Sequence, residues 1–136
     1  MRWRPRWAVG ISFVLICSLV TSAGAQTKRI TVKFKRGSSG ATYKNSVSGF
    51  GTVDYVAKAN AGQTMSVKLK SSNPYLYFYL GKDDFIEPLS ESARTTTSWL
   101  GQLPDTGGYL IRVYLFRNAA RVNKTPVRFT LRIAIN

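Results

Sequence analysis

The chain has 136 residues, of which 20 are Lys or Arg and only 6 are Asp or Glu, so its net charge is +14. It contains no histidine and a single cysteine, which excludes Ser-His-Asp triads, Cys-His pairs and His-based metal sites. A chain of this length is expected to form one domain with a modest core.

The N-terminal segment has the three parts of a secretory signal peptide. Arginines begin it, an apolar run follows at 8–20, and small residues end it at Ala25. The apolar run has 13 residues against the roughly 20 that span a bilayer, so a membrane anchor is the weaker alternative. Cleavage after Ala25 would remove residues 1–25, Cys17 included, and would lower the net charge from +14 to +11. The mature protein, residues 26–136, is predicted to be a single exported domain without a membrane span.

Such a basic protein is attracted to acidic partners. Nucleic acid is the usual candidate, but export argues against it. The remaining candidates are anionic envelope polymers, membrane surfaces and acidic clefts on other proteins.

Apolar and polar residues alternate along most of the remaining chain, as they do in strands with one buried face. The alternating or strand-like segments, in chain order, are 30–35, 41–47, 53–59, 65–70, 75–80, 96–100, 109–116 and 127–135. Turn residues separate them, and 88–97 is the one place where a helical turn fits. Seven or eight short strands predict an all-β protein, an antiparallel, jelly-roll-like β-sandwich.

The basic residues mostly occupy the outward positions of these strands, where solvation is their ordinary explanation. Tyr75, Tyr77 and Tyr79 alternate with apolar residues and could form a ligand platform. The favoured interpretation is instead an inner strand covered on both faces.

Four of the six carboxylates, Asp83, Asp84, Glu87 and Glu91, cluster in a predicted loop. Paired carboxylates could serve a hydrolase, and a carboxylate cluster could hold Ca²⁺. The calcium-loop pattern is absent, and a solvated acidic loop is the favoured interpretation. The sequence therefore predicts no enzyme, no metal site and no cofactor.

Two segments could carry binding chemistry. Residues 35–43 form a small-residue loop flanked by cations and closed by Tyr43. Residues 117–124 break the strand alternation, and a helix-like turn there would align Arg117 with Arg121. Two guanidinium groups side by side can grip carboxylates bidentately, although a solvated hairpin loop remains the alternative.

The same two segments resemble a known family. Residues 32–39, with Tyr43 shortly after, and residues 117–125, with the pattern R-N-x-A-R-x-N-K-T, resemble the periplasmic inhibitors of g-type (goose-type) lysozyme. The likeness covers about residues 29–135. A weaker framework of Tyr, Gly-Gln, Leu-Pro and Gly-Tyr is also similar to bacterial pre-peptidase C-terminal domains.

The resemblance implies a periplasmic β-sandwich that inserts two loops into the substrate cleft of g-type lysozyme. The residues carried over by motif are Ser38, Ser39 and Tyr43 in one loop and Arg117, Asn118 and Arg121 in the other. A lysozyme cleft contains carboxylates, one of them the general acid, so arginines placed there would pair with them and exclude substrate. The competing hypotheses are an envelope or carbohydrate-binding module of the pre-peptidase type and, least favoured, a carboxylate hydrolase.

Overall fold

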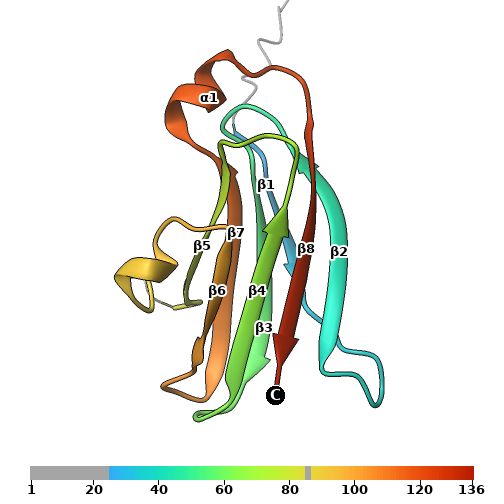
Figure 1. The fold of residues 1–136 in the computed structure, drawn as a ribbon, viewed down its shortest axis with the longest axis vertical. Coiled ribbons are helices and arrows are strands. Elements are labelled where there is room, and N and C mark those ends of the chain that lie inside the picture. Colours follow the sequence, from blue (N-terminus) through green and yellow to red (C-terminus); the bar gives the residue numbers. More distant parts are fainter. Residues whose placement is uncertain (1–24, 85–86) are drawn as a thin grey trace, which may run out of the picture.

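The computed structural model describes residues 25–84 and 87–136, so residues 1–24 of the predicted signal peptide lie outside the described part. Its elements are β1 (Thr27–Thr31), β2 (Gly40–Val47), β3 (Thr52–Ala59), β4 (Thr64–Lys70), β5 (Leu76–Lys82), the 3-10 turn η1 (Glu91–Ala93), β6 (Ser98–Gln102), β7 (Gly107–Leu115), α1 (Arg117–Val122) and β8 (Val127–Ile135). One sheet has the order β1-β3-β7-β5 and the other β2-β8-β4-β6. The sheets pack face to face (Figure 1), which confirms the predicted all-β sandwich.

Each described connection passes from one sheet to the other, because odd-numbered strands form one sheet and even-numbered strands the other. The segment between β7 and β8 therefore bridges the two sheets, and the alternative of a hairpin loop there does not hold. Five of the six strand pairs are antiparallel as predicted, but β1 pairs with β3 in parallel. The chain reverses direction between β1 and β2 and again between β2 and β3, so β1 and β3 point the same way.

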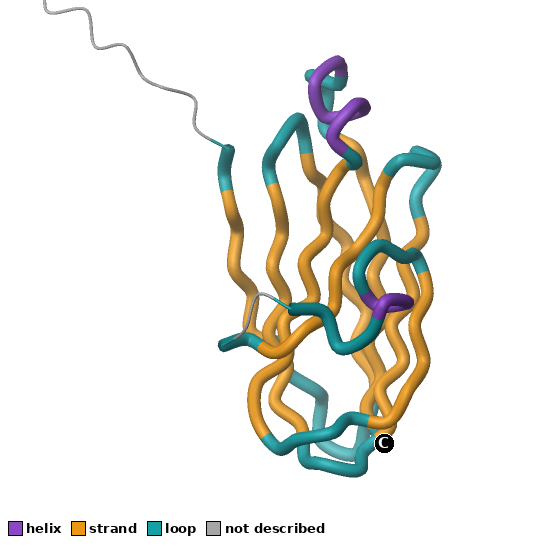
Figure 2. Tube along the Cα trace, turned by 90° about the vertical axis from the view of Figure 1, so that its left-hand side faces the viewer, coloured by secondary structure: helices purple, strands orange, loops and turns teal. Residues whose placement is uncertain are grey.

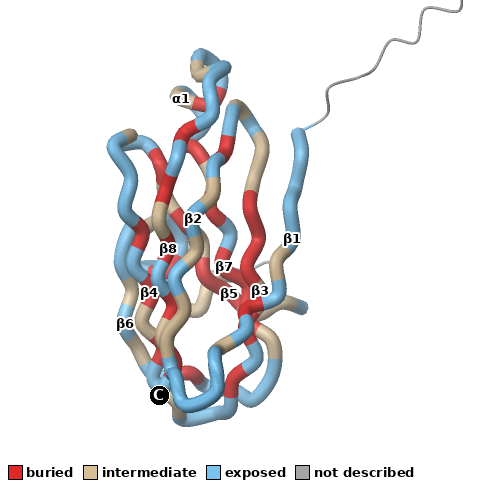
Figure 3. Tube along the Cα trace, turned by 90° about the vertical axis from the view of Figure 1, so that its right-hand side faces the viewer, coloured by how far each residue is buried: buried red, intermediate tan, exposed pale blue. Residues whose placement is uncertain are grey.

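Alternate residues of each strand build the core between the sheets. Along β8 the five apolar side chains are at most 7% exposed, while Arg128 and Arg132 between them are exposed. Each buried large apolar side chain contributes about 1.5–3 kcal/mol to folding. The buried positions line the interior of both sheets, whereas edge strand β1 is exposed along most of its length (Figure 3).

Strand β5 lies at the edge of its sheet, so its prediction as an inner strand is wrong. Leu76, Phe78 and Leu80 face the core, and the tyrosines between them are half-buried on the outer face. The segment after β5 runs back along this edge, where the backbone NH and carbonyl of Thr96 bond the carbonyl and NH of Phe78. That segment contains η1, which confirms the helical turn predicted at 88–97.

The two ends of the sandwich carry different loops (Figure 2). Tyr114 of β7 pairs with Thr52 of β3, and Phe116 NH donates to the carbonyl oxygen of Tyr75 at 2.8 Å. The 48–51 turn, the 71–75 loop and α1 therefore lie together at one end, called here the α1 end. The C-terminus and the loop between β1 and β2 lie at the other end.

Candidate protein-binding surface

The α1 end gathers most of the exposed large apolar side chains of residues 25–84 and 87–136. Those at the α1 end are Phe50 (54% exposed), Tyr75 (55%), Phe116 (47%) and Val122 (80%), and the fifth, Leu100 (73%), lies apart on β6. A cluster of exposed apolar side chains on a small domain marks an interaction surface. The surface rests on the core, because Ala120 of α1 is 4% exposed and belongs to the main apolar cluster.

Phe50 lies at the tip of a tight turn between two glycines. Gly51 NH donates to the carbonyl oxygen of Ser48 at 3.0 Å. Gly49 has a φ of +54°, and a positive φ only at the second turn position is typical of a type II′ turn. A Cβ on Gly49 would lie 3.8 Å from the carbonyl oxygen of Ala120, so the turn places Phe50 beside α1.

Replacing Gly49 with Ala is expected to lower the free energy of unfolding by about 1 kcal/mol, because an L side chain disfavours this backbone conformation. Urea unfolding measures the change. Ser48→Ala, in the same turn, is the control and should have little effect. Equal stability of the Gly49→Ala variant and the unmodified protein would contradict the assigned turn.

Helix α1 exposes the three predicted binding residues Arg117, Asn118 and Arg121. Arg117 and Arg121 are four positions apart on a helix and therefore share a side. The ion pairs among the described residues involve other cations. They are Arg29–Asp83, Lys82–Asp105, Arg94–Glu91 and Arg112–Asp54. Both α1 guanidinium groups are thus available to carboxylates of a partner.

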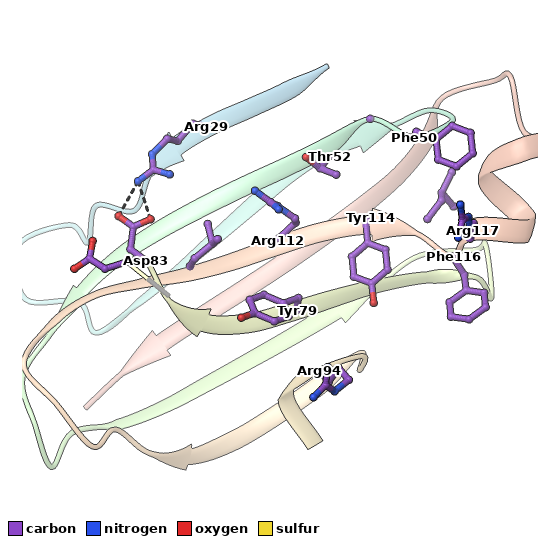
Figure 4. Close-up of a pocket in the computed structure, with 14 residues that line it drawn as sticks. Arg29, Phe50, Thr52, Tyr79, Asp83, Arg94, Arg112, Tyr114, Phe116 and Arg117 are labelled. Carbon is purple, nitrogen blue, oxygen red and sulfur yellow. Dashed lines mark hydrogen bonds and ion pairs between the residues drawn. The ribbon is translucent and has the colours of Figure 1, made fainter. Parts of the chain in front are cut away.

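Phe50 lines two hollows, and each of them is also lined by one of these arginines. A groove of about 820 Å³ on the outer face of the β1-β3-β7-β5 sheet has Phe50, Phe116 and Arg117 at one end (Figure 4). A second hollow of about 700 Å³ is lined by Phe50, Arg121 and Lys124. The α1 end thus presents the aromatic ring of Phe50 between the guanidinium groups of Arg117 and Arg121.

Arg112, which lines the larger groove, forms a cross-strand ion pair with Asp54. Arg112 Nε and Nη2 donate to the two carboxylate oxygens of Asp54 at 2.7 and 2.8 Å. Asp54 is 2% exposed and is the only buried charged residue of the described chain. Its hydrogen bonds raise the pKa of the Arg112 guanidinium above the ordinary value. The Arg112 guanidinium therefore binds a carboxylate of the protein itself, unlike those of Arg117 and Arg121.

The predicted serine loop lies at the opposite end of the molecule. Ser38 Oγ donates to the carbonyl oxygen of Gly40 at 3.0 Å, and the carbonyl oxygen of Ser39 accepts from Ile135 NH at 2.9 Å. These contacts tie the loop to the C-terminal end of β8, whereas α1 precedes the other end of that strand. At about 3.4 Å per residue, nine-residue β8 separates the two loops by roughly 27 Å.

Tyr43 is a half-buried part of the sandwich. Its hydroxyl accepts from Lys33 NH at 3.1 Å, and its ring centroid lies 5.0 Å from that of Tyr55. The structure therefore brings together Arg117, Asn118 and Arg121 and places Ser38, Ser39 and Tyr43 away from them.

Two aromatic residues of this surface were missed by the sequence analysis. Phe50 stands between two glycines in a segment that predicts only a turn, and Phe116 ends the strand predicted at 109–116, whereas β7 ends at Leu115. The sequence signal for Phe50 is a large aromatic residue between two turn glycines, because a side chain at the tip of a tight turn cannot reach the core.

The acidic segment does not form a cluster in the described part of the chain. Asp83 pairs with Arg29 and Glu91 with Arg94, and no three potential metal-binding side chains converge there. The pairing lowers the pKa of Glu91. Nor does any described helix have the length and apolarity to cross a membrane.

The comparisons with curated proteins and with solved structures agree with each other. No family model matches the sequence. The inhibitor of g-type lysozyme from Escherichia coli (strain K12) is 32% identical over 114 residues, which cover 82% of this chain and 86% of that protein.

Two solved structures extend the likeness to the fold. PliG of Aeromonas hydrophila, a periplasmic inhibitor of g-type lysozyme, is 30% identical with a TM-score of 0.71, over 82% of this chain and 99% of that one. PliG of Salmonella Typhimurium is 26% identical with a TM-score of 0.65, over 80% and 98% of the two chains. On this shared sequence and fold, the chain belongs to the family of g-type lysozyme inhibitors.

Proposed function

We propose that this protein acts in the periplasm as an inhibitor of g-type lysozyme and that its α1 end occupies the substrate cleft of the enzyme. One observation carries the proposed site: Arg117 and Arg121 are exposed, have no carboxylate partner in the described chain, and flank the exposed ring of Phe50. Family membership supports the choice of partner.

The arrangement suits a cleft that contains acidic catalytic groups. A glycosidase cleft holds carboxylates that act on the glycosidic bond, and a guanidinium group can bind a carboxylate through two parallel hydrogen bonds. Phe50 would fill a sugar-binding position as a rigid apolar anchor, in the manner of aromatic hot spots. The inhibitor would exclude substrate by occupying the cleft, and its arginines would neutralise the acidic groups of the enzyme.

This mechanism needs no chemistry from the inhibitor itself. The protein would act by binding and not as an enzyme, in keeping with its relatives. The alternative of a pre-peptidase-like carbohydrate-binding module is not favoured by the comparisons.

Phe50→Ala is expected to weaken inhibition by about 10- to 100-fold, the range for truncating an aromatic anchor at the centre of an interface. The inhibition constant against purified g-type lysozyme measures the effect. Leu100→Ala is the matched control, because Leu100 is also a large exposed apolar residue but lies away from α1. Equal loss in the two variants would argue against the assigned surface.

Inhibition of a panel of g-type, c-type and i-type lysozymes by residues 26–136 tests the function itself. Lysis of bacterial cell walls by the g-type enzyme should stop when the inhibitor is in molar excess. Undiminished lysis by the g-type enzyme would refute the proposed function.

A further inference from the structure

The outer face of the β2-β8-β4-β6 sheet carries exposed cations and no carboxylate. Its exposed basic residues are Lys44 on β2, Lys68 and Lys70 on β4, and Arg128 and Arg132 on β8. These four strands contain no Asp or Glu, because all six carboxylates of the chain lie in the other sheet or in loops. None of the five cations takes part in an ion pair within the described residues.

The strand register packs these charges close together. Arg132 of β8 lies directly opposite Lys68 of β4, while Thr130 lies between Lys44 and Lys70 on the neighbouring strands. Like charges directly opposite each other in an antiparallel pair destabilise a sheet. An anionic partner would remove the cost of this pairing.

A hollow in this face adds neutral hydrogen-bond donors to the cations. Its volume is about 700 Å³, and it is lined by Lys44, Lys70 and Arg128 together with Ser46 and Thr130. Cations that stand beside hydroxyl groups suit phosphate oxygens, which accept several hydrogen bonds at once. The hollow lies on this sheet face and extends to Ser71 and Ser72 of the 71–75 loop, so it adjoins the α1 end without including Phe50 or α1.

We propose that this face docks the protein onto a bilayer surface rich in anionic phosphate-bearing lipid headgroups. A bilayer is favoured by charge complementarity, because five cations and no carboxylate spread over a broad sheet face. A polybasic surface gains about 1 kcal/mol for each Lys or Arg brought to an anionic membrane. The proposal rests on the proposed periplasmic location, because the periplasm is bounded by membranes.

Binding to vesicles tests the proposal with a charge-matched pair of variants. The face variant is Lys44→Gln/Lys70→Gln/Arg128→Gln, and the control is Lys33→Gln/Lys35→Gln/Arg36→Gln in the exposed β1–β2 loop. Both remove two lysines and one arginine. The unmodified protein should sediment with phosphatidylglycerol-containing vesicles at low salt and not with phosphatidylcholine vesicles.

The face variant should lose about 100-fold in partitioning, as expected for three cations at an anionic surface, and the control should lose only a few-fold. Equal losses would show that net charge alone draws the protein to the membrane, and would overturn the proposal. So would binding to a short DNA duplex with no binding to vesicles.

Inhibition of g-type lysozyme separates this proposal from the proposed function. The face variant should inhibit as well as the unmodified protein, since its three substitutions lie in β2, β4 and β8 and not in the 48–51 turn or α1. Lost vesicle binding with intact inhibition supports membrane docking. Intact vesicle binding in the face variant refutes docking through this face, whatever the result with lysozyme.

Discussion

Replacing Arg117 and Arg121 together with alanine is expected to weaken inhibition of g-type lysozyme by about 1000-fold. Truncating one partner of a buried, hydrogen-bonded charge pair at an interface costs about 2–5 kcal/mol, much of it because the other charge is left unpaired. The two costs are not additive, since both groups act in one cleft. Faster dissociation should account for most of the loss, and surface plasmon resonance with the inhibition constant measures both.

The opposite end of the sandwich provides the control for this double variant. Ser38→Ala/Ser39→Ala changes the other predicted loop, roughly 27 Å away along nine-residue β8, and should leave inhibition unchanged. Arg117→Lys/Arg121→Lys should recover only part of the affinity, because lysine keeps the charge but lacks the bidentate fork. Unchanged potency of the double alanine variant would remove α1 from the interface.

Arg112→Ala is expected to lower the free energy of unfolding by about 2–3 kcal/mol. Breaking a buried ion pair costs about 3–5 kcal/mol when a charge is left uncompensated. We expect the smaller loss of about 2–3 kcal/mol because the Arg112 side chain is 44% exposed, so water can reach the site. Asp54, whose side chain is 3% exposed, would be left without its two guanidinium hydrogen bonds. Urea unfolding measures the loss.

Two further variants make this stability prediction specific. Arg29→Ala removes an ion pair whose arginine is 57% exposed, and should cost at most about 1 kcal/mol. Adding Asp54→Asn to Arg112→Ala should recover part of the stability, because the unpaired buried charge is then gone. A loss no larger for Arg112→Ala than for Arg29→Ala would contradict a structural role for the buried pair.

The strands could be predicted from the sequence because their signal is local. The alternation in β8 places five apolar residues on one side. This pattern can be recognised in the sequence without knowing which strand pairs with β8. The pairing is not local. The parallel contact between β1 and β3 and the edge position of β5 depend on the order in which the chain crosses between the sheets.

The candidate site could be predicted only in part for the same reason. The spacing of Arg117 and Arg121 indicated a shared side before α1 was seen, because four residues make about one helical turn. Sequence order could not reveal that Ser38 lies at the far end of the sandwich, since that depends on where the β1–β2 loop meets the end of β8. Nor could it place Phe50 beside α1, a contact between segments some 70 residues apart.

Hydrogen exchange of the inhibitor alone and in complex with g-type lysozyme tests the central claim most directly. Amide exchange reports which backbone segments become protected when the partner binds. We expect new protection in the 48–51 turn and at 116–124, with no change in the 35–40 loop. Protection confined to 35–40, with the α1 end exchanging as in the free protein, would contradict the account.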